Sequence, residues 1–267
     1  MIAKPTHVAG NRLLASLSPF MHAAFIAESE IVHLREGDAL VDPDVLIQHV
    51  VFPVTCVLAT LSVLPDRTAV ETAVTGYEGV APVAVMNGVN AIPEHIITLM
   101  PGEARRVGIP LFRRAIAEDA AFRELLQRYS VALFTLTAQT AGCNQRHSVV
   151  QRCARWLLRT HDRVVGDEFP LTHLFLSQLL GVRRSSVTVA AEALRSAGAI
   201  TYTRGTVRIV NREILESCAC QCYSVVRAMF DRMLGIGATP NPLAGVRMSL
   251  NGRTLIGTSH QEPVLSV

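Results

Sequence analysis

The stretch LLGVRRSSVTVAAEALRSAG, residues 179–198, carries two patterns at once. A turn at Gly181 precedes two arginines and two serines, and a segment of small apolar residues follows and ends at a second glycine. Val187, Ala191 and Leu194 are spaced as the buried face of a helix. The basic and polar residues at the front could meet an anionic partner, because helix N-termini attract anions.

A second helix is predicted directly before this stretch. Thr172 is placed to cap a helix over residues 173–180, since its hydroxyl can accept a free backbone N–H. Gly181 permits the left-handed conformation of a sharp turn, and the helix over residues 184–196 follows. The two helices and their short turn predict a helix-turn-helix.

A hairpin follows the helix pair. Short strands are expected over residues 200–203 and 207–210, joined by Arg204, Gly205 and Thr206. The order helix, turn, helix, hairpin is typical of the winged helix-turn-helix, whose second helix enters the major groove of DNA.

The residue types at the front of the second helix suit DNA contacts. Arg184 can donate two hydrogen bonds to a guanine edge, and Val189 can touch a thymine methyl group. Arg183 and the hydroxyl groups suit phosphates or base edges. The complete set of candidate DNA-binding residues is Thr172, His173, Gln178, Arg183, Arg184, Ser185, Ser186, Thr188, Val189 and Arg204.

At these residues the chain resembles a known family. From RCARWLL (152–158) through about residue 216 it resembles the C-terminal DNA-binding domain of the Crp/Fnr family of bacterial transcription regulators. The stretches EIVHLREGDALVDPD (30–44), HVVFP (49–53) and TGYEGV (75–80) resemble strands and turns of that family's cyclic-nucleotide-binding-like β-roll.

The resemblance implies an α+β fold with an N-terminal antiparallel β-roll, a long dimerisation helix and a C-terminal winged helix-turn-helix. Short β-branched segments between turn signals indicate an antiparallel sandwich, barrel or roll, and the resemblance implies the roll. We expect the β-roll over residues 1–117, the dimerisation helix over 118–145, the DNA-binding domain over 146–225, and a helix end with a loosely ordered tail over 226–267.

The resemblance also implies roles for single residues. Arg184 takes the position of the family's base-reading arginine, and Ser186 takes that of a phosphate-contacting hydroxyl. Thr172, His173 and Gln178 fall where the first helix contacts the DNA backbone. Ser185 and Val189 stand where the family often has Glu and a second Arg, so operator preference is expected to differ there.

The segment from Ala115 to Cys143 repeats apolar residues at steps of three and four, which is typical of a helix with a narrow seam. Such a helix packs either on its own sheet or against a second copy in a symmetric dimer. The family resemblance implies the dimer. The seam residues, assigned to dimerisation, are Phe122, Leu125, Tyr129, Ala132, Leu136, Gln139 and Cys143.

The sensor half lacks the residues of a nucleotide pocket. Glu78 lies where the family binds ribose, but residues 79–103 contain no Lys or Arg. A buried phosphate without a cation would lose much solvation energy, so no cyclic nucleotide is expected. No cysteine cluster precedes Cys56, and nothing selects a haem ligand among the histidines, so no cofactor is assigned.

Three cysteines close together form an unusual motif, Cys218, Cys220 and Cys222. On one helix over residues 212–234, Cys218 and Cys222 would share a face and Cys220 would point elsewhere. Spacing by two is not typical of zinc or iron–sulfur sites. We therefore expect half-buried helix cysteines and no metal site, with a thiol- or metal-responsive regulator as an alternative.

Composition agrees with a DNA-binding regulator. Residues 1–150 hold 11 Lys and Arg against 14 Asp and Glu, whereas residues 151–225 hold 10 against 6. This asymmetry indicates separate tasks for the two halves. Residues 45–65 are uncharged but rich in β-branched residues and split by Pro53, so they predict two buried strands rather than a membrane span. No signal peptide is recognisable at the N-terminus, so we expect the six cysteines to be reduced thiols in the cytoplasm.

The sequence therefore predicts a sequence-specific DNA-binding transcriptional regulator that acts as a homodimer on an inverted repeat, without cyclic nucleotide. Double-stranded DNA and a second copy are the expected partners, and RNA polymerase is a further candidate. The alternative from another class is a cupin-like β-barrel enzyme. Its metal centre would need a His-x-His pair, which none of the nine histidines forms, so no enzymatic activity is expected.

Overall fold

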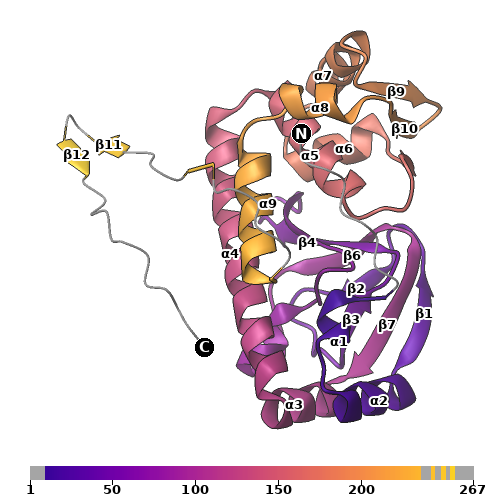
Figure 1. Cartoon of the computed structure of the whole chain (residues 1–267). Coiled ribbons are helices and arrows are strands. Elements are labelled where there is room, and N and C mark those ends of the chain that lie inside the picture. The colour runs from indigo at the N-terminus through magenta and orange to yellow at the C-terminus, as the bar shows by residue number, and fades with distance from the viewer. Residues whose placement is uncertain (1–9, 236–241, 244–247, 251–252, 256–267) are drawn as a thin grey trace.

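The computed structural model describes residues 10–235, 242–243, 248–250 and 253–255. Its architecture is α+β, as predicted, with a β domain below a helical domain in Figure 1 and a long helix along one side. Most of the predicted tail lies outside the described residues. Within the described ranges, no helix combines the length and apolarity needed to cross a bilayer.

The N-terminal part is built from two antiparallel sheets with strand orders β1-β7-β3 and β2-β6-β4-β5. Strands β3 and β4 occupy the uncharged stretch around Pro53, which confirms the two strands predicted there. The elements are α1 Arg12–Ala15, α2 Pro19–Glu28, β1 Glu30–Leu34, β2 Ala39–Val41, β3 His49–Pro53, β4 Val57–Val63, β5 Ala69–Thr75, η1 Val83–Asn87, β6 His95–Met100, β7 Gly102–Gly108, α3 Ile109–Glu118 and α4 Ala120–Arg146.

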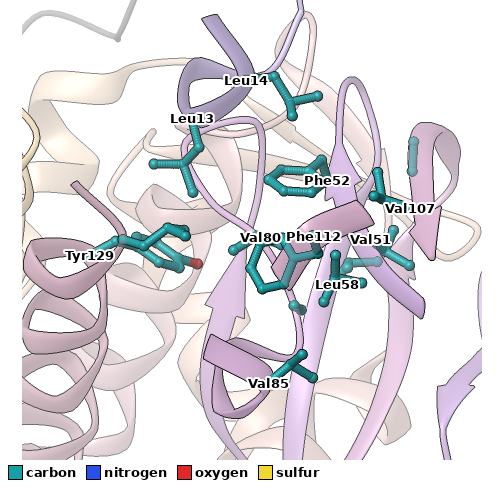
Figure 2. Close-up of a cluster of buried hydrophobic side chains, with 14 of the residues drawn as sticks. Leu13, Leu14, Val51, Phe52, Leu58, Val80, Val85, Val107, Phe112 and Tyr129 are labelled. Carbon is teal, nitrogen blue, oxygen red and sulfur yellow. The ribbon is translucent and has the colours of Figure 1, made fainter. Parts of the chain in front are cut away.

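Four phenylalanines form the centre of this domain's core. Phe25, Phe52, Phe112 and Phe122 are fully buried, and each ring meets two others edge to face at 6.1–6.4 Å between centroids. Edge-to-face contacts add to the stabilisation from burial itself. The ring cluster joins α2, β3, α3 and α4, and Figure 2 shows Phe52 and Phe112 within it.

The long helix starts at a cap that the periodicity did not indicate. Asp119 is extended and separates α3 from α4, and its carboxylate accepts hydrogen bonds from the N–H groups of Phe122 (3.0 Å) and Ser18 (2.9 Å). These bonds hold the pKa of Asp119 below its usual range. The helix predicted over residues 118–145 therefore runs from Ala120 to Arg146.

The predicted seam of α4 packs inside the chain, which corrects its assignment to dimerisation. Phe122, Tyr129, Ala132, Leu136 and Cys143 are all buried within one chain, and the predicted Leu125 and Gln139 are partly buried. The β-roll core and α9 cover this face. Of the two interpretations of the periodicity, packing within the chain is the one that the structure shows.

Within the described residues, the C-terminal part contains the helices α5 to α9, a three-stranded sheet and the two-stranded sheet β11–β12. Ser148 caps its first helix with a reciprocal capping box to Gln151. The three-stranded sheet has the order β8-β10-β9, and β8 was not predicted from the sequence. The elements are α5 Val149–His161, β8 Glu168–Pro170, α6 His173–Leu180, α7 Arg184–Ser196, β9 Ile200–Thr203, β10 Thr206–Ile209, α8 Arg212–Cys218, α9 Cys222–Met233, β11 Met248–Leu250 and β12 Arg253–Leu255.

The single helix predicted over residues 212–234 is wrong. Ala219 is extended, with φ −81° and ψ 156°, so α8 ends at Cys218 and α9 begins at Cys222. The break lets α9 turn and lie along α4, where Phe230 meets Tyr129 edge to face at 6.3 Å (Figure 1). Burial of this apolar face outweighs the local preference for one continuous helix.

The two domains are joined through a buried carboxylate on β5. Glu71 accepts a hydrogen bond from the Trp156 indole (2.7 Å) and lies 3.6 Å from the Arg159 guanidinium. Burial raises the pKa of Glu71, while Arg159 and Trp156 oppose this rise. The apolar residues around them belong to one core that spans both domains and includes Val57, Met100 and Trp156.

Removal of the Glu71 charge should destabilise the chain. We expect Glu71→Gln to lower the free energy of unfolding by about 3 kcal/mol, because Arg159 would keep a buried charge without a carboxylate. Urea denaturation at constant protein concentration measures the change. The matched control is Glu168→Gln, which removes an exposed ion pair to Arg208 and should cost less than about 1 kcal/mol. Equal losses for both variants would contradict the importance of the buried pair.

Candidate DNA-binding interface

The helix-turn-helix forms at the residues predicted from the sequence. Thr172 caps α6 by accepting the N–H of Phe175 at 3.1 Å, and α6 and α7 have the predicted bounds. Gly181 ends α6 with φ +60°, a conformation that glycine adopts without steric cost. The next N–H, of Val182, reaches back to the Ser177 carbonyl at 2.9 Å, which closes the turn.

One face of α7 seats the helix on its domain. Val187, Ala190 and Leu194 are fully buried, whereas Ala191 is only partly buried. The predicted stripe placed Ala191 in the core, and the structure corrects this to Ala190. The helix is thus turned slightly from the predicted orientation, and its opposite face stays open.

The front end of α7 presents cations and free backbone groups to solvent. The side chain of its N-cap residue, Arg183, makes no capping hydrogen bond, and its first turn contains no acidic residue. Arg183, Arg184 and Ser185 are exposed, and the side chain of Val189, one turn further, is 69% exposed. An uncapped helix N-terminus beside two guanidinium groups is well suited to phosphate.

Two of the predicted DNA-contact residues, His173 and Thr188, contact each other within the domain. The Thr188 hydroxyl donates to the Arg184 carbonyl at 3.1 Å and also lies 3.1 Å from His173 Nδ1. The His173 ring packs on the Tyr202 ring at 4.5 Å. Burial, with a smaller effect from the Arg184 charge, lowers the pKa of His173. His173 and Thr188 therefore connect α6, α7 and β9.

The wing is a tight hairpin with an arginine at its tip. Arg204 and Gly205 have φ values of +49° and +84°, and two-residue hairpin turns use such left-handed residues. Arg204 is exposed there. The neighbouring β8 pairs with β10 and carries Glu168, which forms an exposed ion pair with Arg208 at 3.5 Å. Arg208 adds a cation to the wing that the predicted site did not include.

A second group of predicted residues borders a cleft between the domains. Gln178, Arg183 and Ser186 line a space of about 920 Å³ whose opposite wall includes Arg67 and Val70 of the β4–β5 hairpin. The predicted DNA-binding residues therefore fall into two groups that face different directions. The tip of α7 and the wing face outward, and one side of the turn faces the β-roll.

The turn at Glu78 and Gly79, which the family resemblance relates to ribose binding, is filled by side chains of the protein itself. Glu78 is buried and accepts a hydrogen bond from Arg163 Nε at 2.8 Å. A Cβ atom at Gly79 would lie 2.1 Å from the Tyr129 hydroxyl, so α4 lies directly against this turn. Figure 2 shows Tyr129 directing that hydroxyl toward Val80. Neither Arg163 nor Tyr129 was linked to this turn by sequence reasoning.

The sequence and the fold both match known regulators. Residues 151–218 match the family model of the Crp-like helix-turn-helix domain. No curated protein matches the chain by sequence.

Three solved structures illustrate the likeness in fold. A protein described as a Crp/Fnr family transcriptional regulator from Eubacterium rectale is 13% identical, with a TM-score of 0.60 over 77% of this chain and 96% of that one. FixK2 from Bradyrhizobium japonicum is 16% identical, with a TM-score of 0.60 over 72% and 98%. The c-di-GMP responsive global regulator CLP from Xanthomonas campestris is 14% identical, with a TM-score of 0.55 over 73% and 100%.

These likenesses agree with the recognition element seen in the structure. At such low identity the solved structures show the fold, and the family model adds the identity of the domain that contains α6 and α7. The matched domain is a helix-turn-helix and the likeness in fold is to Crp/Fnr structures, which argues against the cupin-like alternative. Residues 151–218 are therefore a Crp-like helix-turn-helix domain, in a chain with the fold of the Crp/Fnr family of DNA-binding transcriptional regulators.

Proposed function

We propose that the protein binds an inverted-repeat operator as a homodimer and regulates transcription without a cyclic nucleotide. The observation that carries this proposal is the uncapped front of α7, where Arg183, Arg184 and Ser185 are exposed on a helix that its own domain holds firmly. Each copy would place α7 in a major groove, with Arg204 of the wing on the adjacent backbone.

Specificity should reside in the outward face of α7. Arg184 can form two hydrogen bonds with a guanine, and Val189 offers an apolar surface to a thymine methyl group. Ser185 can contact a base edge or a phosphate. Thr172 would fix the position of the domain on the phosphate backbone, and Gln178, Arg183 and Ser186 would do so from the rim of the cleft that they line. Thr188 and His173 act indirectly, because their contact holds α7 against α6.

A second copy has a suitable surface on the outer side of α4. The seam that faces inward is occupied, but Phe134 is 74% exposed and Val131 is 48% exposed on the opposite side of the helix. Ala138 is exposed one turn further. Large exposed apolar side chains on a long helix favour pairing with the same helix of another copy. The proposed contact between the two copies therefore lies on this outer face of α4.

The state of the β-roll supports regulation without cyclic nucleotide. Glu78 is already paired with Arg163, and Tyr129 fills the space beside Gly79. The stretch that follows has no Lys or Arg as far as residue 103. A cyclic phosphate placed here would displace a buried ion pair and would find no cation in that stretch.

Binding to DNA should be specific and sensitive to salt. We expect the full-length protein to select an inverted repeat from random duplexes, and its affinity for that site to fall steeply as salt rises, because arginines displace counterions from phosphates. Fluorescence anisotropy at several salt concentrations measures the slope. Binding that is insensitive to salt, or equal to that for a scrambled duplex, would overturn the proposal.

Replacement of the base-reading arginine should weaken the selected site more than other sites. We expect Arg184→Ala to cost about 1–3 kcal/mol on the operator and to relax specificity at one base position. The matched control is Arg195→Ala at the far end of the same helix, where the guanidinium pairs with Glu192 at 2.7 Å. A uniform loss on all sequences would make Arg184 a phosphate contact instead.

A charge on the outer face of α4 should separate the copies. We expect Phe134→Asp to convert the dimer to a monomer in sedimentation velocity, because an apolar contact would then bury a carboxylate. Phe20→Asp is the control, since Phe20 is 79% exposed on α2, outside the proposed dimer face. If the unaltered protein is a monomer, or if both variants dissociate equally, the proposed dimer face is wrong.

A further inference from the structure

Four side chains that can bind metal converge near the end of α4. Cys143 lies in the last turn of that helix and His147 directly follows it, whereas Cys220 lies between α8 and α9 and Cys222 is the first residue of α9. Their ligand atoms all lie within 4.8 Å of one another. The three cysteines are buried and form an isolated cluster, while His147 is partly exposed at its edge.

The break between α8 and α9 creates this cluster. On a continuous helix Cys220 would point away from Cys222, which is why the sequence spacing did not indicate a metal site. The extended Ala219 instead turns Cys220 and Cys222 toward α4. Cys218, at the end of α8, is not part of the group. The expectation of half-buried helix cysteines therefore fails for Cys220 and Cys222, which are buried in the cluster.

The separations fit one tetrahedral ion. Zinc lies about 2.3 Å from thiolate sulfur and about 2.0–2.1 Å from imidazole nitrogen, so tetrahedral ligands should be about 3.8 Å apart for two sulfurs and about 3.6 Å for sulfur and nitrogen. The Cys143 and Cys220 sulfurs are 3.5 Å apart, and Cys222 Sγ lies 3.6 Å from His147 Nδ1.

Two other arrangements of these side chains fit less well. A disulfide would need about 2.05 Å between sulfurs, whereas all six cysteines are unpaired. An iron–sulfur cluster would hold its outer ligands farther apart, because several iron and sulfide ions lie between them. Three thiolates and one imidazole around a single centre are typical of structural zinc.

The surroundings would compensate the charge of such a centre. Three thiolates, a neutral imidazole and Zn²⁺ carry a net charge of about −1. Arg152 and Arg155 of α5 are buried, and among the described residues neither guanidinium has a carboxylate at ion-pair distance. Their Nε atoms have no hydrogen-bond partner there either, and both groups interact electrostatically with Cys143.

An outer hydrogen bond is also in place. Gln139 Nε2 donates to Cys222 Sγ at 3.0 Å from one turn before Cys143 on α4. Donors of this kind orient metal ligands and stabilise the thiolate form. Gln139, which was assigned to the dimer seam, instead contacts this cluster.

We propose that Cys143, His147, Cys220 and Cys222 bind one zinc ion. The ion ties the end of α4 to the start of α9, at the point where the chain passes from α4 through His147 into α5. Because α5 carries the DNA-binding domain, the zinc ion stabilises the joint between that domain and the long helix. The site is independent of the proposed contact with DNA.

Metal analysis of the full-length protein tests the proposal. We expect protein purified under reducing conditions to contain about one zinc per chain, and the metal-free protein to bind Co²⁺ with the visible absorption of tetrahedral thiolate coordination. Cys220→Ser should weaken Co²⁺ binding more than the roughly 10–100-fold that follows loss of an outer partner. Cys218→Ser is the matched control and should bind like the unaltered protein.

A second variant tests the site without altering a buried side chain, in case Cys220→Ser fails to fold. His147→Ala changes a partly exposed side chain at a helix end, so it should fold and yet lose most of its Co²⁺ affinity. Chelation should lower the melting temperature of the unaltered protein and of Cys218→Ser but not that of His147→Ala. Zinc well below one equivalent without tetrahedral Co²⁺ absorption would overturn the proposal. The proposal would also fail if Cys218→Ser lost as much Co²⁺ affinity as Cys220→Ser, or if a Cys143–Cys220 disulfide excluded metal.

Discussion

Two buried carboxylates hold the β-roll against the DNA-binding domain, and much of the structure depends on them. Glu71 of β5 faces Trp156 and Arg159, and Glu78 in the turn after β5 faces Arg163. An isolated buried carboxylate costs several kcal/mol, so each needs a partner at a defined place. The partners all lie on α5 or directly after it. This requirement positions α5 across the sheet, and with it the helix-turn-helix.

The same contacts fill the turn that follows β5. With Glu78 paired to Arg163 and with Tyr129 against Gly79, this turn forms a joint between the β-roll and the DNA-binding domain. The cleft beside Arg183 and Ser186 is a second consequence, since α6 packs on β5. The orientation of the recognition helix is therefore coupled to the β-roll through packed, charged contacts rather than through a flexible linker.

The recognition element could be predicted almost residue by residue because its signals are local. Thr172 caps a helix, Gly181 supplies a left-handed turn, and the spacing from Val187 to Leu194 marks a buried face. The bounds of α6 and α7 follow from these features alone. Strand β8 was missed because three residues next to Gly166 and Asp167 resemble a loop until they pair with β10.

The sequence by itself determined the two helices and the hairpin of the recognition element and the apolar seam of α4, since these follow from backbone preferences and side-chain spacing. Only the tertiary structure decided what covers each face. The periodic spacing of apolar residues indicated the seam of α4, but it did not indicate that α9 and the β-roll would cover this seam. The cysteines were visible as a motif, but only the break at Ala219 brings Cys220 and Cys222 to Cys143. Both outcomes depend on contacts between residues far apart in the chain, which local spacing does not encode.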